Sequence, residues 1–133
     1  MNLKSKESKL KVLLIDDDPD MCALTEKVLT KFGHEVAAFP DSTAGIAYAR
    51  KNPLNLILMD IMLAGLSGPE IVVNLQADPQ LRNIPVVFLT GLVTGSEQSL
   101  QNEGLEVKGK KYPTLGKPYE IEQLLNAVKK YAK

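Results

Sequence analysis

Short, continuous apolar runs alternate along the chain with longer stretches in which apolar residues recur at helical spacing. Runs of this kind without polar alternation are typical of strands buried on both faces of a sheet. They predict strands at residues 11–16, 35–39, 55–60, 85–90 and 112–116. The last run contains Pro113, which favours a position at the edge of the sheet.

The stretches between these runs predict five helices. Asp18 precedes the first helix as an N-cap, with Pro19 in its first turn, and Asp41 or Ser42 caps the second. Capping boxes at 67–70 and 94–97 predict the starts of the third and fourth helices, and the fourth helix extends toward Lys111. The fifth helix is expected to start near Pro118. Strands alternating with helices predict an α/β fold with a parallel sheet and right-handed crossovers.

Polar side chains follow the apolar runs where the strands should end. The first run ends in Asp16, Asp17 and Asp18, the third in Asp60 and the fourth in Thr90, and Lys117 follows the fifth. The carboxyl ends of parallel strands share one edge of the sheet, so these groups should converge there. Clustered carboxylates without histidine or cysteine favour a hard cation, Mg²⁺ first and Mn²⁺ or Ca²⁺ behind it.

A hydroxyl and an ammonium beside such a cation are suited to a phosphoryl group. Thr90 would donate a hydrogen bond, and Lys117 would supply the counter-charge. Asp60 has no evident capping role, because the next capping box begins seven residues later at Ser67. Asp18, in contrast, is expected to cap a helix rather than to bind the cation.

Composition narrows the function further. Among 133 residues, 16 lysines and arginines balance 16 aspartates and glutamates, which argues against electrostatic binding of nucleic acid. No apolar run reaches the roughly 18 residues that a membrane span needs, and no signal peptide is evident. Cys22 is the only cysteine, so a reducing, cytoplasmic location is expected. Residues 1–9 are expected to form a polar tail and residues 10–133 one domain.

Four separated motifs together resemble the receiver domain of two-component response regulators. They are "VLLIDDDP", "LILMDIMLAGLSG", "PVVFLTG" and "LGKPY", and the resemblance covers about Lys11 to Lys130. It implies a flavodoxin-like (βα)5 sandwich with strand order 2-1-3-4-5. It also implies a cytoplasmic signalling switch, rather than a turnover enzyme, which a histidine kinase or histidine phosphotransfer protein phosphorylates. A downstream protein partner is expected, but neither nucleic acid nor membrane.

The resemblance also implies a role for each site residue. Asp60 would be the phosphoacceptor, and Asp16, Asp17, Asp60 and the backbone carbonyl of Met62 would hold Mg²⁺. Thr90 would bind the phosphoryl group, and Lys117 would pair with Asp60 and then with the phosphate. The bond before Pro118 would be cis, as in the family, and would help to aim the lysine.

Three positions depart from the family. Ala64 and Ser67 replace a usual proline and a common aspartate, and both changes should be tolerated. Thr114 occupies the position where receivers usually carry the aromatic residue that moves with the threonine. Tyr112 lies two residues earlier and would project from the same strand face, about 7 Å away. The usual coupling is therefore expected to be absent or altered, with Tyr112 as a partial substitute.

Two alternatives stay open from the sequence. Asp16 and Asp18 mimic the Asp-x-Asp pattern of haloacid-dehalogenase-like, Mg²⁺-dependent phosphatases, although Asp20 stands where that motif has threonine. The other alternative is a pseudo-receiver that docks partners without being phosphorylated, which the intact aspartate, threonine and lysine set argues against. The sequence also leaves open whether the chain is a stand-alone regulator or part of a larger protein.

Overall fold

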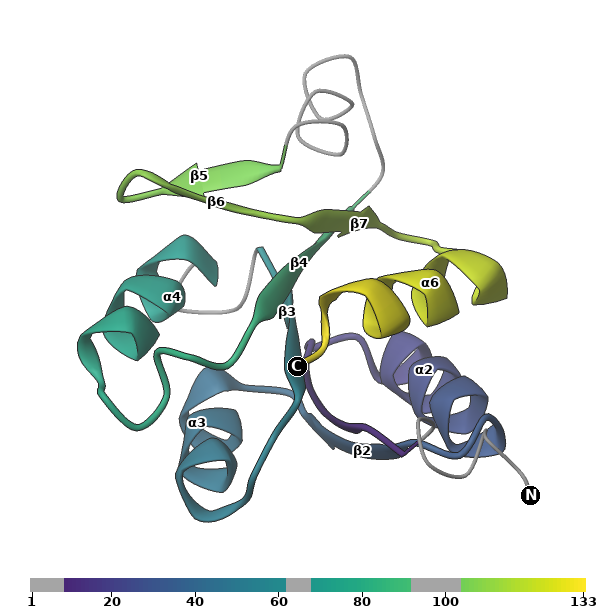
Figure 1. Ribbon diagram of the computed structural model, residues 1–133. Coiled ribbons are helices and arrows are strands. Elements are labelled where there is room, and N and C mark those ends of the chain that lie inside the picture. Colours follow the sequence, from purple (N-terminus) through teal and green to yellow (C-terminus); the bar gives the residue numbers. More distant parts are fainter. Residues whose placement is uncertain (1–8, 62–67, 92–103) are drawn as a thin grey trace.

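A central parallel sheet of five strands organises the molecule (Figure 1). The computed structural model describes residues 9–61, 68–91 and 104–133. The strands lie in the order β2-β1-β3-β4-β7, which confirms the flavodoxin-like order predicted from the sequence. Their bounds are β1 Lys11–Ile15, β2 Glu35–Phe39, β3 Leu56–Asp60, β4 Val86–Thr90 and β7 Thr114–Gly116.

Helices cover both faces of this sheet and make a three-layer sandwich (Figure 1). One face packs against α2 and α6, and the other against α3 and α4. The bounds are α2 Pro19–Lys31, α3 Ser42–Lys51, α4 Gly68–Ala77 and α6 Ile121–Tyr131. In the described residues, no helix combines the length and the apolar character that crossing a bilayer requires.

The caps that position the first two of these helices are the predicted ones. The side chain of Asp18 accepts hydrogen bonds from the backbone amides of Asp20 and Met21, at 3.0 and 3.2 Å. Asp41 accepts from the amide of Ala44 at 2.8 Å. Asp18 therefore caps the N-terminus of α2, as expected.

The segment before the last sheet strand differs from the prediction. Residues 105–111 were expected at the end of a fourth helix, but they belong to an antiparallel hairpin of β5 Leu105–Val107 and β6 Lys110–Tyr112. Lys108 and Gly109 connect the strands with positive φ angles of 52° and 81°. Two positive φ angles in a two-residue loop define the hairpin turn that matches strand twist, and this turn excludes a helix. Residues 94–103 of the expected helix lie outside the described residues.

The hairpin also divides the predicted fifth strand. Tyr112 ends β6, whereas only Thr114–Gly116 joins the central sheet beside β4. The reason is Pro113, which has no N–H to donate to a ladder. Its carbonyl still accepts a hydrogen bond from the amide of Phe88, at 2.9 Å, and so begins the pairing of β7 with β4.

Candidate functional site

The predicted site residues lie at the carboxyl end of the sheet because each ends or follows a parallel strand. Asp16 follows β1, Asp60 and Thr90 are the last residues of β3 and β4, and Lys117 follows β7. Three of these side chains belong to buried residues: Asp16 is 1% exposed, Asp60 8% and Thr90 3%. The sheet therefore holds polar groups from four strands in one partly desolvated place.

Lys117 joins the two buried carboxylates. Its Nζ donates to Asp16 Oδ2 at 2.9 Å and to Asp60 Oδ2 at 3.0 Å. Burial lowers the pKa of the Lys117 ammonium, but the hydrogen bonds and charges of Asp16 and Asp60 outweigh burial and raise the pKa above its ordinary value. The lysine therefore stays charged and offsets the repulsion between the carboxylates.

The carboxylates can also share a cation. One oxygen each from Asp16, Asp17 and Asp60 lies within 4.8 Å of the other two, and Asp17 is the exposed member of the set. Carboxylate oxygens from three side chains suit a hard divalent ion such as Mg²⁺. Asp18 stays outside this cluster, because it caps α2. Met62, whose carbonyl the resemblance adds as a ligand, lies outside the described residues.

Thr90 presents a hydroxyl that the described residues leave unsatisfied. Its Oγ1 is buried and has no hydrogen-bond partner among them. An unpaired buried hydroxyl costs free energy unless something else accepts its proton. The strand end thus offers a donor for a group that carries acceptor oxygens, such as a phosphoryl group.

The backbone fixes the position of Lys117 relative to Thr90. The amide of Lys117 donates to the carbonyl of Thr90 at 2.6 Å, and the Lys117–Pro118 peptide bond is cis. On the other side of the bond, the buried hydroxyls of Tyr119 and Thr25 share a hydrogen bond that ties this loop to α2. The sequence analysis assigned no role to this pair; its only signal was the place of Tyr119 in the "LGKPY" motif.

Gly68 also positions the backbone of the site, whereas from the sequence it was expected only to let the turn after Asp60 form. A Cβ on this residue would lie 2.8 Å from the backbone oxygen of Asp60 and 2.9 Å from Phe88 Cε1. The Gly68 amide donates to the carbonyl of Ile61 at 2.6 Å. Glycine therefore lets the start of α4 lie directly against the backbone of Asp60.

Cys22 lies beside the acidic cluster but has the character of an inert thiol. Its Sγ donates to the backbone carbonyl of Asp16 at 3.2 Å. Burial first, and then the negative charges of Asp16, Asp18 and Glu26, raise the pKa of the thiol to about 11. The thiol is thus protonated at neutral pH, which argues against a nucleophilic role.

Tyr112 and Thr114, which were predicted to act in the switch together with Thr90, lie in different strands. Thr114 is half-buried in β7 and pairs in register with Phe88 of β4, two residues before Thr90. Tyr112 is buried at 3% exposure in the hairpin, among the residues between the sheet, α3 and α4. Its ring contacts that of Phe88, so both residues meet β4 close to Thr90.

Comparison with known proteins gives one family. Residues 12–129 match the model of the response regulator receiver domain. The chain is 30% identical over 118 residues to the protein PilH of Pseudomonas aeruginosa, covering 89% of this chain and 93% of PilH. It is 32% identical over 117 residues to the hybrid signal transduction histidine kinase D of Dictyostelium discoideum, covering 88% of this chain and 7% of the kinase.

Solved structures share the fold. The chemotaxis protein CheY4 of Vibrio cholerae has a TM-score of 0.77 at 23% identity, with 92% of this chain and 98% of CheY4 covered. Three of the curated relatives are much longer proteins, of which this chain spans 7%, 26% and 46%. The similarity therefore concerns the domain rather than those whole proteins.

Proposed function

Because the chain belongs to the response regulator receiver domain family, we propose that it accepts a phosphoryl group on Asp60 in a Mg²⁺-dependent reaction. The donor is a phosphohistidine on a histidine kinase or phosphotransfer protein. The receiver domain comprises residues 10–133, works in the cytoplasm and acts as a switch for a downstream protein. The phosphorylation of Asp60 is our inference from the site and is not taken from the names of PilH or of the hybrid kinase.

The observation that carries this proposal is the position of Lys117 between Asp60 and Asp16. An Asp60 oxygen attacks phosphorus, the phosphorus–nitrogen bond to the donor histidine breaks, and its electron pair returns to the imidazole. Lys117 then pairs with the new phosphoryl oxygens, and the unsatisfied hydroxyl of Thr90 donates to one of them.

The cluster of Asp16, Asp17 and Asp60 supports a role for Mg²⁺. These carboxylates, with the carbonyl of Met62, would hold the ion. When bound, it supplies positive charge that neutralises the phosphoryl oxygens during transfer. Lys117 supplies one positive charge to the same carboxylates, and the exposed Asp17 leaves the cluster open to the solution and to the donor protein.

The proposed switch begins where the phosphate adds negative charge. Phosphorylation changes the charge at the end of β3 from about −1 for the carboxylate to about −2 for the acyl phosphate, and it gives Thr90 an acceptor. Movement of Thr90 toward the phosphoryl group would shift β4. The shift would reach the neighbouring hairpin, because Phe88 of β4 packs on Tyr112. Such local changes can bias a two-state surface that selects a partner.

Labelling with acetyl phosphate tests the proposal. The wild-type chain should take up one alkali-labile phosphoryl group in Mg²⁺ and none in EDTA, and Asp60→Asn should take up none. Asp18→Asn is the matched control, because asparagine caps a helix about as well as aspartate and Asp18 lies outside the cluster. Undiminished label in Asp60→Asn would remove Asp60 from its role.

The labelling experiment, together with assays of phosphomonoester hydrolysis and of partner binding, separates the alternative functions. One label per chain followed by slow loss supports the receiver, whereas steady release of phosphate from a phosphomonoester would indicate a phosphatase. A chain that takes no label in Mg²⁺ but still binds a partner would be a pseudo-receiver. Binding of Mg²⁺ without any phosphodonor is a separate readout: Mg²⁺ should raise the melting temperature of wild type, and Asp17→Asn should remove most of that rise.

A further inference from the structure

A second cleft lies at the opposite end of the sheet from the acidic cluster. It has a volume of about 350 Å³. Its walls are the segment that leads into β4, the junction of β6 with β7 and the end of α6. Strands β4 and β7 both begin there, whereas Thr90 and Lys117 lie at their other ends. The cleft therefore shares no residue with the proposed phosphorylation site.

Cationic side chains from all three walls surround this cleft. They are Arg82, Lys110, Lys111, Lys130 and Lys133. No aspartate or glutamate is among the described residues that line it. Because 16 acidic residues balance the 16 basic residues of the whole chain, this gathering is a local separation of charge and not a general excess.

The carboxylates near the cleft do not neutralise the positive charges of these five residues. Asp78, close to Arg82 in the chain, is paired with Arg50 at 3.0 Å. Glu106 lies across the hairpin from Lys111. Within the described part of the chain, however, none of the five cleft cations is within 4.0 Å of a carboxylate oxygen in an ion pair. Like charges around one cavity repel, so an anionic partner would gain by neutralising them.

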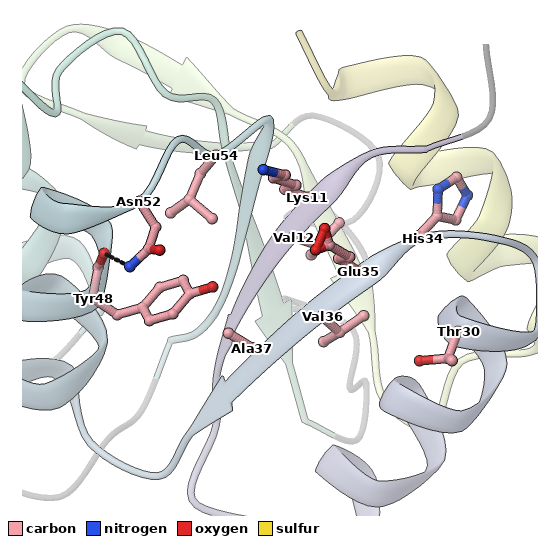
Figure 2. A pocket seen from close by; sticks show the side chains of 10 residues that line it. All are labelled: Lys11, Val12, Thr30, His34, Glu35, Val36, Ala37, Tyr48, Asn52 and Leu54. Atoms are coloured by element: carbon pink, nitrogen blue, oxygen red, sulfur yellow. Dashed lines mark hydrogen bonds between the residues drawn. The ribbon is translucent and has the colours of Figure 1, made fainter. Parts of the chain in front are cut away.

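A similar cleft beside β2 shows the contrast (Figure 2). It also has a volume of about 350 Å³, but its lining contains both Lys11 and Glu35. Figure 2 shows these two side chains together with the hydroxyl of Tyr48 from α3 and the side-chain amide of Asn52 directly after this helix. Its charges are therefore mixed, and they favour no particular sign of ligand.

The backbone around the cationic cleft is well anchored. The carbonyls of Pro85 and Pro113 accept hydrogen bonds from Ile57 and Phe88, both at 2.9 Å. The end of the chain is tied to the loop before β3, since the Lys133 amide donates to the backbone oxygen of Asn55 at 3.0 Å. Long, exposed lysine side chains therefore extend from a fixed frame.

Two of the lysines also contact aromatic rings. The Nζ atoms of Lys110 and Lys130 each lie 5.2 Å from a ring centroid, those of Tyr112 and Tyr131 respectively. Cation–π contacts of this kind are modest at exposed positions and leave the ammonium groups able to bind anions.

We propose that this cleft docks an acidic, carboxylate-rich segment of a protein partner. Its charge complements such a segment. The exposure of its lysines suits a protein surface better than the enclosed pocket of a small ligand. The balanced charge of the chain disfavours the broad basic surface that nucleic acid requires. The docking does not depend on phosphorylation of Asp60, so either proposal can fail without the other.

Fluorescence anisotropy with a labelled polyglutamate peptide tests this inference on the full chain. Wild type should bind the peptide at low ionic strength and release it as salt is added. Lys110→Gln with Lys130→Gln should weaken binding roughly three- to tenfold, because each exposed ion pair contributes modestly. Asp60→Asn should bind as wild type does.

The matched control is Lys27→Gln with Lys31→Gln, which removes two exposed lysines of α2 and changes the net charge equally. This variant should bind the peptide as wild type does. Equal weakening in both double variants would show an effect of net charge and overturn the proposal. So would the absence of peptide binding, or equally tight and equally lysine-dependent binding of a labelled oligothymidylate.

Discussion

The ring of Tyr112 packs edge-on against the ring of Phe88, with 5.7 Å between the ring centroids and 74° between the planes. Tyr112 thus lies inward, in the core between the sheet and its helices. Its hairpin packs against α4 and β4 through this ring and through Val107. The pair joins the segment that was predicted to be helical to the strand that ends in Thr90.

We expect Tyr112→Ala to lower the free energy of unfolding by about 3 kcal/mol, because it removes a buried aromatic side chain. Tyr112→Phe retains the ring and should cost less than about 1 kcal/mol. Urea unfolding curves measure both. A loss in Tyr112→Ala no greater than that in Tyr112→Phe would contradict the packing described here.

The position of the Tyr112 ring bears on whether this residue substitutes for the aromatic residue that receivers usually carry at position 114. Because the ring is already buried, we expect its proton contacts with Phe88 to persist when beryllofluoride mimics the phosphoryl group. Nuclear Overhauser effects between the two rings, with and without the mimic, measure this. Disappearance of these effects on adding beryllofluoride would show that Tyr112 moves with the site after all.

Gly68 gives a prediction about the backbone of Asp60. In Gly68→Ala the new Cβ would lie 2.8 Å from the Asp60 backbone oxygen, so the start of α4 must shift. We expect a loss of about 1–3 kcal/mol in stability, as for other overpacked sites, and slower labelling by acetyl phosphate. Gly91→Ala is the control, since a Cβ on Gly91 would have no described atom within 4 Å. Similar effects of both substitutions would contradict a specific role for Gly68.

The placement of most candidate site residues was predictable because it depends on strand ends. Asp16, Asp60 and Thr90 each close an apolar run, and parallel strands bring their ends to one edge. Asp18 followed by Pro19 identified the cap of α2 in the same local way. Such features can be predicted from the local sequence and from the parallel direction of the strands.

Other features depend on contacts between residues that are distant in the sequence. The bond between Thr25 and Tyr119 joins residues 94 positions apart, and the need for glycine at 68 arises from the distance to Asp60 in the folded chain. The hairpin was missed for a different reason. The capping box at 94–97 suggested a helix that extends toward Lys111, whereas Lys108-Gly109 with two positive φ angles specifies a turn.

Alkaline pH should destabilise the protein. Burial raises the pKa of Tyr112, Tyr119 and the Cys22 thiol, the last to about 11, and the carboxylates around Lys117 raise its pKa despite burial. A group whose pKa is higher in the folded chain holds its proton there but loses it in the unfolded chain. Stability is therefore full below the unfolded-state pKa values and declines as pH rises from about 9.

Urea unfolding between pH 7 and 11 measures this decline. Cys22→Ala removes one of the four groups and should make the loss of stability above pH 9 less steep. Stability that is flat or rises with pH across this range would contradict the direction of the shifts. Thiol titration gives an independent check, because a thiol with a pKa of about 11 should react slowly at pH 8 in the folded chain.

The charge balance around Lys117 gives a last prediction. Its ammonium is 2.9 Å from Asp16 and 3.0 Å from Asp60, and its side chain is 14% exposed. Lys117→Met leaves two largely buried carboxylates facing each other, so we expect a loss of about 2 kcal/mol in EDTA. Because Mg²⁺ would replace the missing positive charge, it should stabilise this variant more than it stabilises wild type.

Lys9→Met is the control for that experiment. Lys9 forms a looser pair with Glu35, at 3.7 Å, and the two side chains are 65% and 51% exposed. Water screens such a pair, so its removal should change stability by less than about 1 kcal/mol with or without Mg²⁺. If Lys117→Met were as harmless as Lys9→Met in EDTA, the lysine would not be the group that holds the two carboxylates together. If the prediction holds, adding Asp16→Asn to Lys117→Met should recover stability, because the substitution removes one of the two repelling charges.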